Sequence, residues 1–413
     1  MKKNILVSIL SGFALCLVAC GSTGKENTVT NETESLAEVS ESTDAMEADA
    51  STSESSSEVT DSLIEESEES QNEDADYDNE YVEITADENG VLANKYFSIT
   101  LPKEAEGTYV AMATDNSISI FEKEAKEKDF GGFAFSVLIY ENPGDYAGGM
   151  DVKVGEVTSS DGKVYDIVKS LPSDVQWDFT QANEDGEVKM PESYARLYEG
   201  ADDIIKTLVP LDGGEFEFGR GAKGETIYPE VIAKFVQAIE EKWDAKKLED
   251  NEMSSMYSVI GQSEDALTKC GYVFYDTNND GIDELLVGEI AEGEWKGTVY
   301  DIYTVVDREP KHVVSGYERD RYYAEENGFI TNEYSGGAGE SGWISYDIMP
   351  NSTELMPQRA LKYDEYTDPD NPWFVSYDIE NENWESISEE DFNFFMPTEN
   401  YMRFDFTPFS EVK

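Results

Sequence analysis

The chain has few of the side chains on which most metal and nucleophile chemistry depends. Its 413 residues include three cysteines and a single histidine, His312. Cys16 and Cys20 lie at the N-terminus, so Cys270 is the only cysteine after them. This distribution excludes a disulfide bond within residues 21–413 and the usual zinc sites made of several cysteines. We expect Cys270 to be a small buried side chain, with a reactive thiol as the alternative.

Basic residues are also scarce. The chain has 30 lysine and arginine residues and 90 aspartate and glutamate residues, which gives a net charge of −60. Only 20 of the acidic residues fall between residues 21 and 80, so the remainder is strongly acidic as well. A surface of this sign repels nucleic acid and anionic lipid and attracts cations. We therefore expect no nucleic-acid partner.

The longest apolar run lies at the N-terminus and predicts a secretory signal peptide. Lys2 and Lys3 precede it, and residues 5–17 are too few to cross a membrane comfortably. The run ends in Leu-Val-Ala-Cys at residues 17–20, which resembles the lipobox of bacterial lipoproteins. The resemblance implies removal of residues 1–19 and a diacylglycerol on Cys20, which would anchor the chain to the outer face of the cytoplasmic membrane. The alternative is an ordinary signal peptide with a chance cysteine.

Residues 20–80 are predicted to be a disordered tether. They are rich in serine, threonine, glutamate and aspartate, contain no proline, and have no aromatic residue before Tyr77. Such a composition buries too little apolar surface to offset the entropy lost on folding. A flexible chain of this length has an end-to-end distance of roughly 40–45 Å, enough to carry a domain away from a lipid surface. A glycosylated stalk or a docking strip for cations is the alternative.

The remaining length suggests two domains, the first over residues 81–224. Alternating or apolar runs predict strands at 97–101, 117–121 and 133–139, a hairpin of strands 152–157 and 163–168, and a helix over 191–208. Strands with one or two helices indicate an α+β sheet domain. The order of elements resembles PsbP-like domains, whose opening strand also ends in Leu-Pro, here Leu101-Pro102. The resemblance implies a shape and assigns no residue a role.

Residues 225–413 form the second predicted domain, a helical lead-in followed by a mainly antiparallel β-meander. Apolar residues at helical spacing predict a helix that packs on the later sheet, with a partner-binding helix as the alternative: Ile232, Phe235, Val236, Ile239 and Trp243. Strands are predicted at 299–306, 311–316, 321–324, 329–333, 344–348 and 373–379, with a short helix near Ser388. The predicted fold class of the whole chain is therefore α+β.

The most specific pattern in this domain is the nine-residue stretch Asp-Thr-Asn-Asn-Asp-Gly-Ile-Asp-Glu, residues 276–284. It lies between apolar runs at 271–275 and 285–290 that have the composition of strands. Asp276, Asn278 and Asp280 place oxygen atoms at every second position, and glycine at 281 permits a sharp turn. The carbonyl of Ile282 and the carboxylate of Glu284 can complete a shell of oxygen ligands. Such a shell suits calcium.

This stretch resembles the DxDxDG calcium loops of EF-hands, dockerins and FG-GAP-type repeats. The resemblance implies side-chain ligands at Asp276, Asn278 and Asp280, a carbonyl ligand at Ile282, and Glu284 at the ninth position. EF-hand loops end in a glutamate at the twelfth position, where this chain has valine. The strand-like flanks are also closer to FG-GAP-type hairpins. We expect a structural calcium ion, and the alternative is an acidic turn that holds no ion.

Signals for an enzyme are weak. A Ser–His mechanism would have to use His312, which we expect to be solvated or hydrogen-bonded. The glycine-rich segment 335–342 has no lysine after its glycines, so it is not a phosphate loop. Ser341 fails the nucleophile-elbow pattern because Trp343 replaces the last glycine. We expect a flexible hairpin connection here, with a ligand-contacting loop as the alternative.

These observations predict a lipid-anchored, extracellular, non-enzymatic monomer that binds or displays an unidentified protein or glycan. Three alternatives remain open. The first is a cell-wall or glycan hydrolase that uses a pair of carboxylates, which cannot be picked out among so many acidic residues. The second is carbohydrate binding through exposed tryptophans, which more often pack within a sheet. The third is a solute-capture lipoprotein, which would require a large cleft between the domains.

Overall fold

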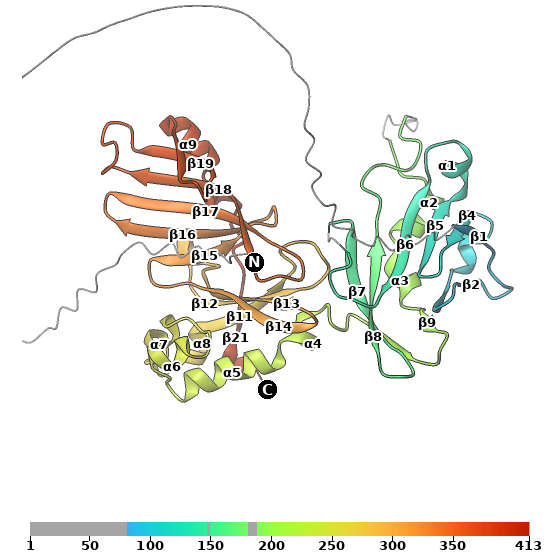
Figure 1. Cartoon of the computed structure of the whole chain (residues 1–413), viewed down its shortest axis with the longest axis horizontal. Coiled ribbons are helices and arrows are strands. Elements are labelled where there is room, and N and C mark those ends of the chain that lie inside the picture. The colour runs from blue at the N-terminus through green and yellow to red at the C-terminus, as the bar shows by residue number, and fades with distance from the viewer. Residues whose placement is uncertain (1–80, 147–148, 181–187, 413) are drawn as a thin grey trace, which may run out of the picture. The chain divides into compact units, whose positions relative to one another are not determined.

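The computed structural model describes residues 81–146, 149–180 and 188–412 (Figure 1). The predicted signal peptide, Cys20 and the tether lie outside these residues. The described residues all belong to one compact unit and contain three antiparallel sheets. Among the residues described, no helix is long and apolar enough to cross a membrane. The mixture of helices and antiparallel sheets confirms the predicted α+β class.

The first sheet has seven strands and lies in what we call the N-terminal lobe, the described part of residues 81–218. Its strand order is β1-β4-β5-β6-β8-β7-β10. The bounds are β1 (Val82–Ile84), β4 (Tyr109–Ala113), β5 (Ser117–Glu122), β6 (Phe133–Tyr140), β7 (Asp151–Thr158), β8 (Val164–Ser170) and β10 (Glu215–Phe218). The predicted strands are present, including the hairpin of β7 and β8, in which Thr158 pairs with Val164.

Two helices and a small sheet pack against the seven-stranded sheet. The small sheet contains β2 (Val91–Ala93), β3 (Phe97–Thr100) and β9 (Val209–Pro210). Phe97 and Ile99 of β3 share one buried core with Phe135 of β6 and Leu197 of a helix. A further helix, α1 (Lys123–Glu127), follows β5, and the Glu122 carboxylate caps it by accepting a hydrogen bond from the Ala125 amide at 2.6 Å.

The single helix predicted over residues 191–208 is wrong. The structure has two short helices, α2 (Glu192–Tyr198) and α3 (Ala201–Ile205), which are separated at Gly200. Glycine lowers helix stability by about 1 kcal/mol relative to alanine, so a break is least unfavourable there. A Cβ atom at Gly200 would lie 2.4 Å from the Arg196 carbonyl oxygen, so the chain bends through a space that only glycine fits.

The C-terminal lobe, residues 229–412, contains an eleven-stranded sheet in the order β20-β19-β18-β17-β16-β15-β13-β12-β11-β21, with β14 paired to β13. The bounds are β11 (Cys270–Tyr275), β12 (Glu284–Glu289), β13 (Val299–Val306), β14 (Glu309–Ser315), β15 (Asp320–Ala324), β16 (Ile330–Gly337), β17 (Glu340–Ile348), β18 (Leu355–Asp364), β19 (Trp373–Asp378), β20 (Asn383–Ser386) and β21 (Thr407–Pro408). Strands β15 to β20 pair in chain order, which confirms the meander.

Two of the differences between the meander and the expectation have a local cause. The glycine-rich segment 335–342 is mostly strand rather than loop, because Ser335 pairs with Ser341 and only two residues connect β16 to β17. Gly342 is required there, since a Cβ atom would lie 2.4 Å from the ring of Tyr334. Strand β18 was not predicted because Pro357 interrupts its pattern. The register shifts at that point, and a bulge tolerates proline within a sheet.

Helices cover the β11–β13 part of the sheet, as expected. The predicted helix is α5 (Pro229–Glu240), and α6 (Ala245–Glu249), α7 (Met256–Ile260) and α8 (Ala266–Lys269) follow it. Phe235 of α5 is fully buried and stacks on Phe409 at 5.7 Å between ring centroids. Cys270 is buried as expected, and burial raises the pKa of its thiol to about 12. The short helix near Ser388 is α9 (Glu389–Phe395).

Replacing Phe235 with alanine should lower the free energy of unfolding by about 3–5 kcal/mol, because the change leaves a cavity among packed rings. Urea denaturation followed by tryptophan fluorescence measures this loss. Phe394 is 83% exposed and provides the control, since Phe394→Ala should change stability by about 0.5 kcal/mol or less. Equal effects of the two substitutions would contradict the packing described here.

Candidate functional site

The predicted calcium loop connects two paired strands. Tyr275 at the end of β11 pairs with Glu284 at the start of β12, and residues 276–283 form the connection. Asn279 and Gly281 both have positive φ angles, 57° and 88°. These two left-handed positions turn the chain back within a few residues, and asparagine and glycine tolerate them best. The loop is therefore a strand–loop–strand hairpin, as its flanks predicted.

The side chains of the three alternate residues fold back onto the loop's own amides. Asp276 accepts hydrogen bonds from the amides of Asp280 at 3.2 Å and Gly281 at 3.0 Å. Asn278 Oδ1 also accepts from the Asp280 amide, at 3.1 Å, and Asp280 Oδ1 accepts from the Ile282 amide at 2.8 Å. The three oxygen-bearing side chains thus gather around one short stretch of main chain.

Burial makes this gathering electrostatically unfavourable when the carboxylates are charged. Asp280 is 2% exposed and Glu284 is fully buried. Desolvation raises the pKa of Asp280 to about 7, and the charge of Asp276 contributes in the same direction. Burial also raises the pKa of Asp276, and it raises that of Glu284 well above its usual range. A cation among these groups would offset the desolvation and the mutual repulsion.

Glu284 is placed differently from the other predicted ligands. One carboxylate oxygen accepts from the Thr277 amide at 2.8 Å and its hydroxyl at 2.6 Å, and the other accepts from the Thr304 hydroxyl at 3.1 Å. Within the residues described, no group of three or more histidine, cysteine, aspartate or glutamate side chains is arranged to hold a metal. The three carboxylates of the predicted ligand set, Asp276, Asp280 and Glu284, are therefore not brought together as such a group, since Glu284 faces two threonines instead.

The loop also touches the N-terminal lobe, which the sequence did not predict. The Lys153 amide of β7 donates to the Asp280 carbonyl at 2.8 Å, and the Gly149 amide donates to the Asn279 carbonyl at 3.1 Å. A Cβ atom at Gly281 would lie 2.4 Å from the Lys153 carbonyl oxygen. Glycine therefore serves both the turn and the close approach of β7.

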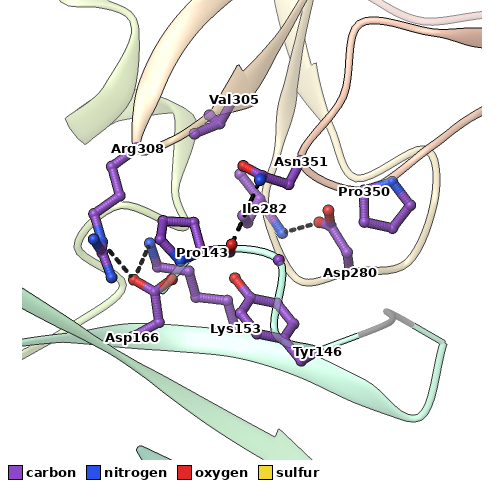
Figure 2. A pocket seen from close by; sticks show the side chains of 11 residues that line it. Pro143, Tyr146, Lys153, Asp166, Asp280, Ile282, Val305, Arg308, Pro350 and Asn351 are labelled. Atoms are coloured by element: carbon purple, nitrogen blue, oxygen red, sulfur yellow. Dashed lines mark hydrogen bonds and ion pairs between the residues drawn. The ribbon is translucent and has the colours of Figure 1, made fainter. Parts of the chain in front are cut away.

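A buried group of charges lies beside this contact (Figure 2). The Lys153 side chain is 1% exposed and forms ion pairs with Glu156 at 2.8 Å and Asp166 at 2.9 Å. Arg308, from the turn between β13 and β14, reaches Asp166 at 3.0 Å. A cavity of 10 Å³, room for about one water molecule, is lined by Lys153, Asp166 and Arg308 together with Asp280. The alternation of side chains along β7 predicts that Lys153 faces solvent. Its buried ion pairs become apparent only in the folded structure.

A second, larger cavity of 240 Å³ adjoins the outer side of the loop. Its lining is mostly polar and comes from three segments: Thr277, Asn278, Asn279, Asn327, Gly328, Asp347, Ile348, Met349 and Pro350. Asp347 is its single carboxylate. No tryptophan lines either of these two cavities. Trp343 and Trp373 instead pack near Phe392 of α9, as expected for aromatic residues within a sheet.

His312 belongs to a compact hydrogen-bonded group. Its Nε2 atom lies 3.1 Å from Asp301 Oδ1 and 3.0 Å from the Ser315 hydroxyl, which itself donates to Asp301 Oδ1. Asp301 is fully buried and also accepts from the Ser254 amide. A catalytic relay requires histidine to bridge serine and aspartate through its two different ring nitrogens. Here both partners contact the same nitrogen, so the arrangement is that of a structural cluster.

Comparisons with known proteins give no family for this chain. Neither protein-family models, nor curated proteins, nor solved structures produced a match.

Proposed function

We propose that the β11–β12 loop binds a structural calcium ion. The observation that carries the proposal is the convergence of Asp276, Asn278 and Asp280 on shared amides at a buried turn. With the carbonyl of Ile282, these residues supply oxygen ligands only, which is the chemistry that calcium prefers. Glu284 already accepts three hydrogen bonds, which leaves one of the roughly four lone-pair sites of its carboxylate for the ion.

The expected strength of binding favours a structural role. Extracellular calcium sites bind at about 10⁻⁴–10⁻³ M, close to the concentration of the ion outside cells. At ten times the dissociation constant, linkage gives only about 1.4 kcal/mol of stabilisation. That energy is enough to hold a hairpin and relieve repulsion between buried carboxylates. A catalytic metal site would need an open coordination position as well.

Chelation of calcium should lower the melting temperature of residues 81–413 by a few degrees, on the order of 3 °C for 1.4 kcal/mol. Asp280→Ala should abolish the difference between calcium and chelator, because it removes a central ligand. Differential scanning calorimetry measures both. Asp405, whose side chain is 92% exposed, supplies the control, and Asp405→Ala should keep the full difference. A wild-type protein indifferent to calcium would refute the site.

Calcium affinity should fall about tenfold between pH 8 and pH 6. The pKa of Asp280 is raised to about 7, so this carboxyl is largely protonated at pH 6, and protons compete with the ion. Titration calorimetry at the two pH values gives the ratio. An affinity that is flat across this range would contradict competition between protons and the ion at Asp280.

We propose that the chain is a lipid-anchored protein of the outer cell surface. Support comes from the apolar signal and from the small residues that precede Cys20. The tether would hold the two lobes away from the membrane, where their acidic surface favours cations or neutral ligands over nucleic acid.

Cys20→Ser should release the protein from the membrane fraction and remove incorporation of a labelled fatty acid. Both are measured after fractionation of the expressing cells. Cys16→Ser is the matched control, since Cys16 lies inside the predicted signal peptide and should leave anchoring intact. Continued lipid labelling of the Cys20→Ser variant would contradict the anchor.

We propose that the chain binds or displays a ligand rather than hydrolysing a glycan. Glycoside hydrolases need two carboxyl groups about 5–10 Å apart around a sugar. The larger cavity is lined by one carboxylate, Asp347, and the smaller is lined by Asp166 and Asp280 but has a volume of only 10 Å³. Neither combines a pair of acids with space for a sugar ring.

A further inference from the structure

The candidate calcium loop is also the point at which three parts of the molecule meet. Its carbonyls at Asn279 and Asp280 accept hydrogen bonds from Gly149 and Lys153 of the N-terminal lobe. Its residues Asp276 and Glu284 continue into β11 and β12 of the C-terminal lobe. One nine-residue segment therefore contacts both lobes.

Asp283 of the same loop holds the linker between the lobes, residues 219–228. Its carboxylate accepts from the Lys223 ammonium at 3.0 Å and from the Gly224 amide at 3.0 Å. Its amide donates to the Ala222 carbonyl at 2.9 Å, and its carbonyl accepts from the Tyr228 hydroxyl at 3.0 Å. All four polar contacts of this residue go to the linker, so movement of the loop would move the linker with it.

Two further residues of the C-terminal lobe join the lobes without involving the loop. Arg308 donates to Asp166 at 3.0 Å and to the Glu141 carbonyl at 2.8 Å. Asn351 donates to the Pro143 carbonyl at 3.5 Å, as Figure 2 shows. Asp166 is buried, and an uncompensated buried carboxylate is strongly unfavourable. Separation of the lobes would remove Arg308 from Asp166 and leave Lys153 as its remaining partner among these ion pairs.

We infer that calcium in the loop strengthens the docking of the two lobes, so that the loop is an ion-dependent latch. This inference rests on the proposed calcium site and adds a role for it. The side chains of Asp276 and Asp280 turn inward, while carbonyls of the same turn accept hydrogen bonds from the other lobe. An ion that fixes the inward side chains also fixes the direction of these carbonyls.

The coupling between ion and docking is reciprocal. If calcium favours the docked arrangement by some factor, docking must raise calcium affinity by the same factor. A substitution that weakens docking should therefore weaken calcium binding, even where the residue is no ligand. This consequence separates a latch from a calcium site that only stiffens its own hairpin.

Arg308→Ala tests this reciprocity, because weakened docking and simple loss of a positive charge predict opposite changes in calcium affinity. Arg308 contacts the N-terminal lobe, so its loss should weaken docking and lower calcium affinity at least threefold in titration calorimetry. Loss of a positive charge alone would raise affinity for a cation. Lys311→Ala is the matched control, because Lys311 lies in the same hairpin and pairs with Glu309 of its own strand at 2.7 Å. It should leave affinity unchanged or slightly higher. Equal or higher affinity in Arg308→Ala would overturn the latch.

Hydrogen exchange provides the second test, because the Lys153 amide donates directly to the Asp280 carbonyl. Calcium should slow exchange of this amide at least tenfold in residues 81–413. The Val137 amide of β6, in the buried middle of the N-terminal sheet, should change much less. Calcium binding without a selective change at Lys153 would overturn the latch and leave the calcium site standing. A wild-type protein that binds no calcium would remove both.

Discussion

The burial of negative charge is the constraint on which the rest of this structure depends. Each deeply buried carboxylate outside the loop has its own compensation. Asp166 is matched by Lys153 and Arg308, whereas Asp301 is held by amide, hydroxyl and imidazole groups. Glu325 accepts hydrogen bonds from the hydroxyls of Thr331 and Ser345. The candidate loop differs, because Asp276 and Asp280 rely mainly on the loop's own amides, with Lys153 only partly offsetting the burial of Asp280.

The placement of the compensating charges links the two lobes. Lys153 belongs to the N-terminal sheet and Arg308 to a turn of the C-terminal one, yet both neutralise Asp166. The contact between the lobes therefore consists of ion pairs around Asp166 and of main-chain hydrogen bonds at the loop. Contacts of this kind are directional, so small shifts of the loop matter more than they would at an apolar interface.

The sequence predicts those features of the fold that depend on the spacing of residues close together in the chain. The hairpins, α5 and the inward-facing triplet of the loop follow from short-range spacing. The break at Gly200 was missed because one glycine outweighs the helical pattern around it, and strand β18 was missed because a bulge accommodates Pro357 within the strand. The role of Lys153 could not be predicted, because Arg308, with which it shares Asp166, is 155 positions away and the solvent side of β7 is covered only in the folded chain.

The turn that presents Arg308 is conformationally unusual. Asp307 and Arg308 both have positive φ angles, 52° and 65°. Each non-glycine residue in the left-handed region is disfavoured by about 1–2 kcal/mol, and asparagine with glycine would form this tight turn more easily. The hairpin thus gives up local stability so that a guanidinium can stand at its tip. The unfavourable backbone conformation lies in the turn between β13 and β14, whereas the ion pair that it makes possible stabilises a carboxylate of the N-terminal lobe.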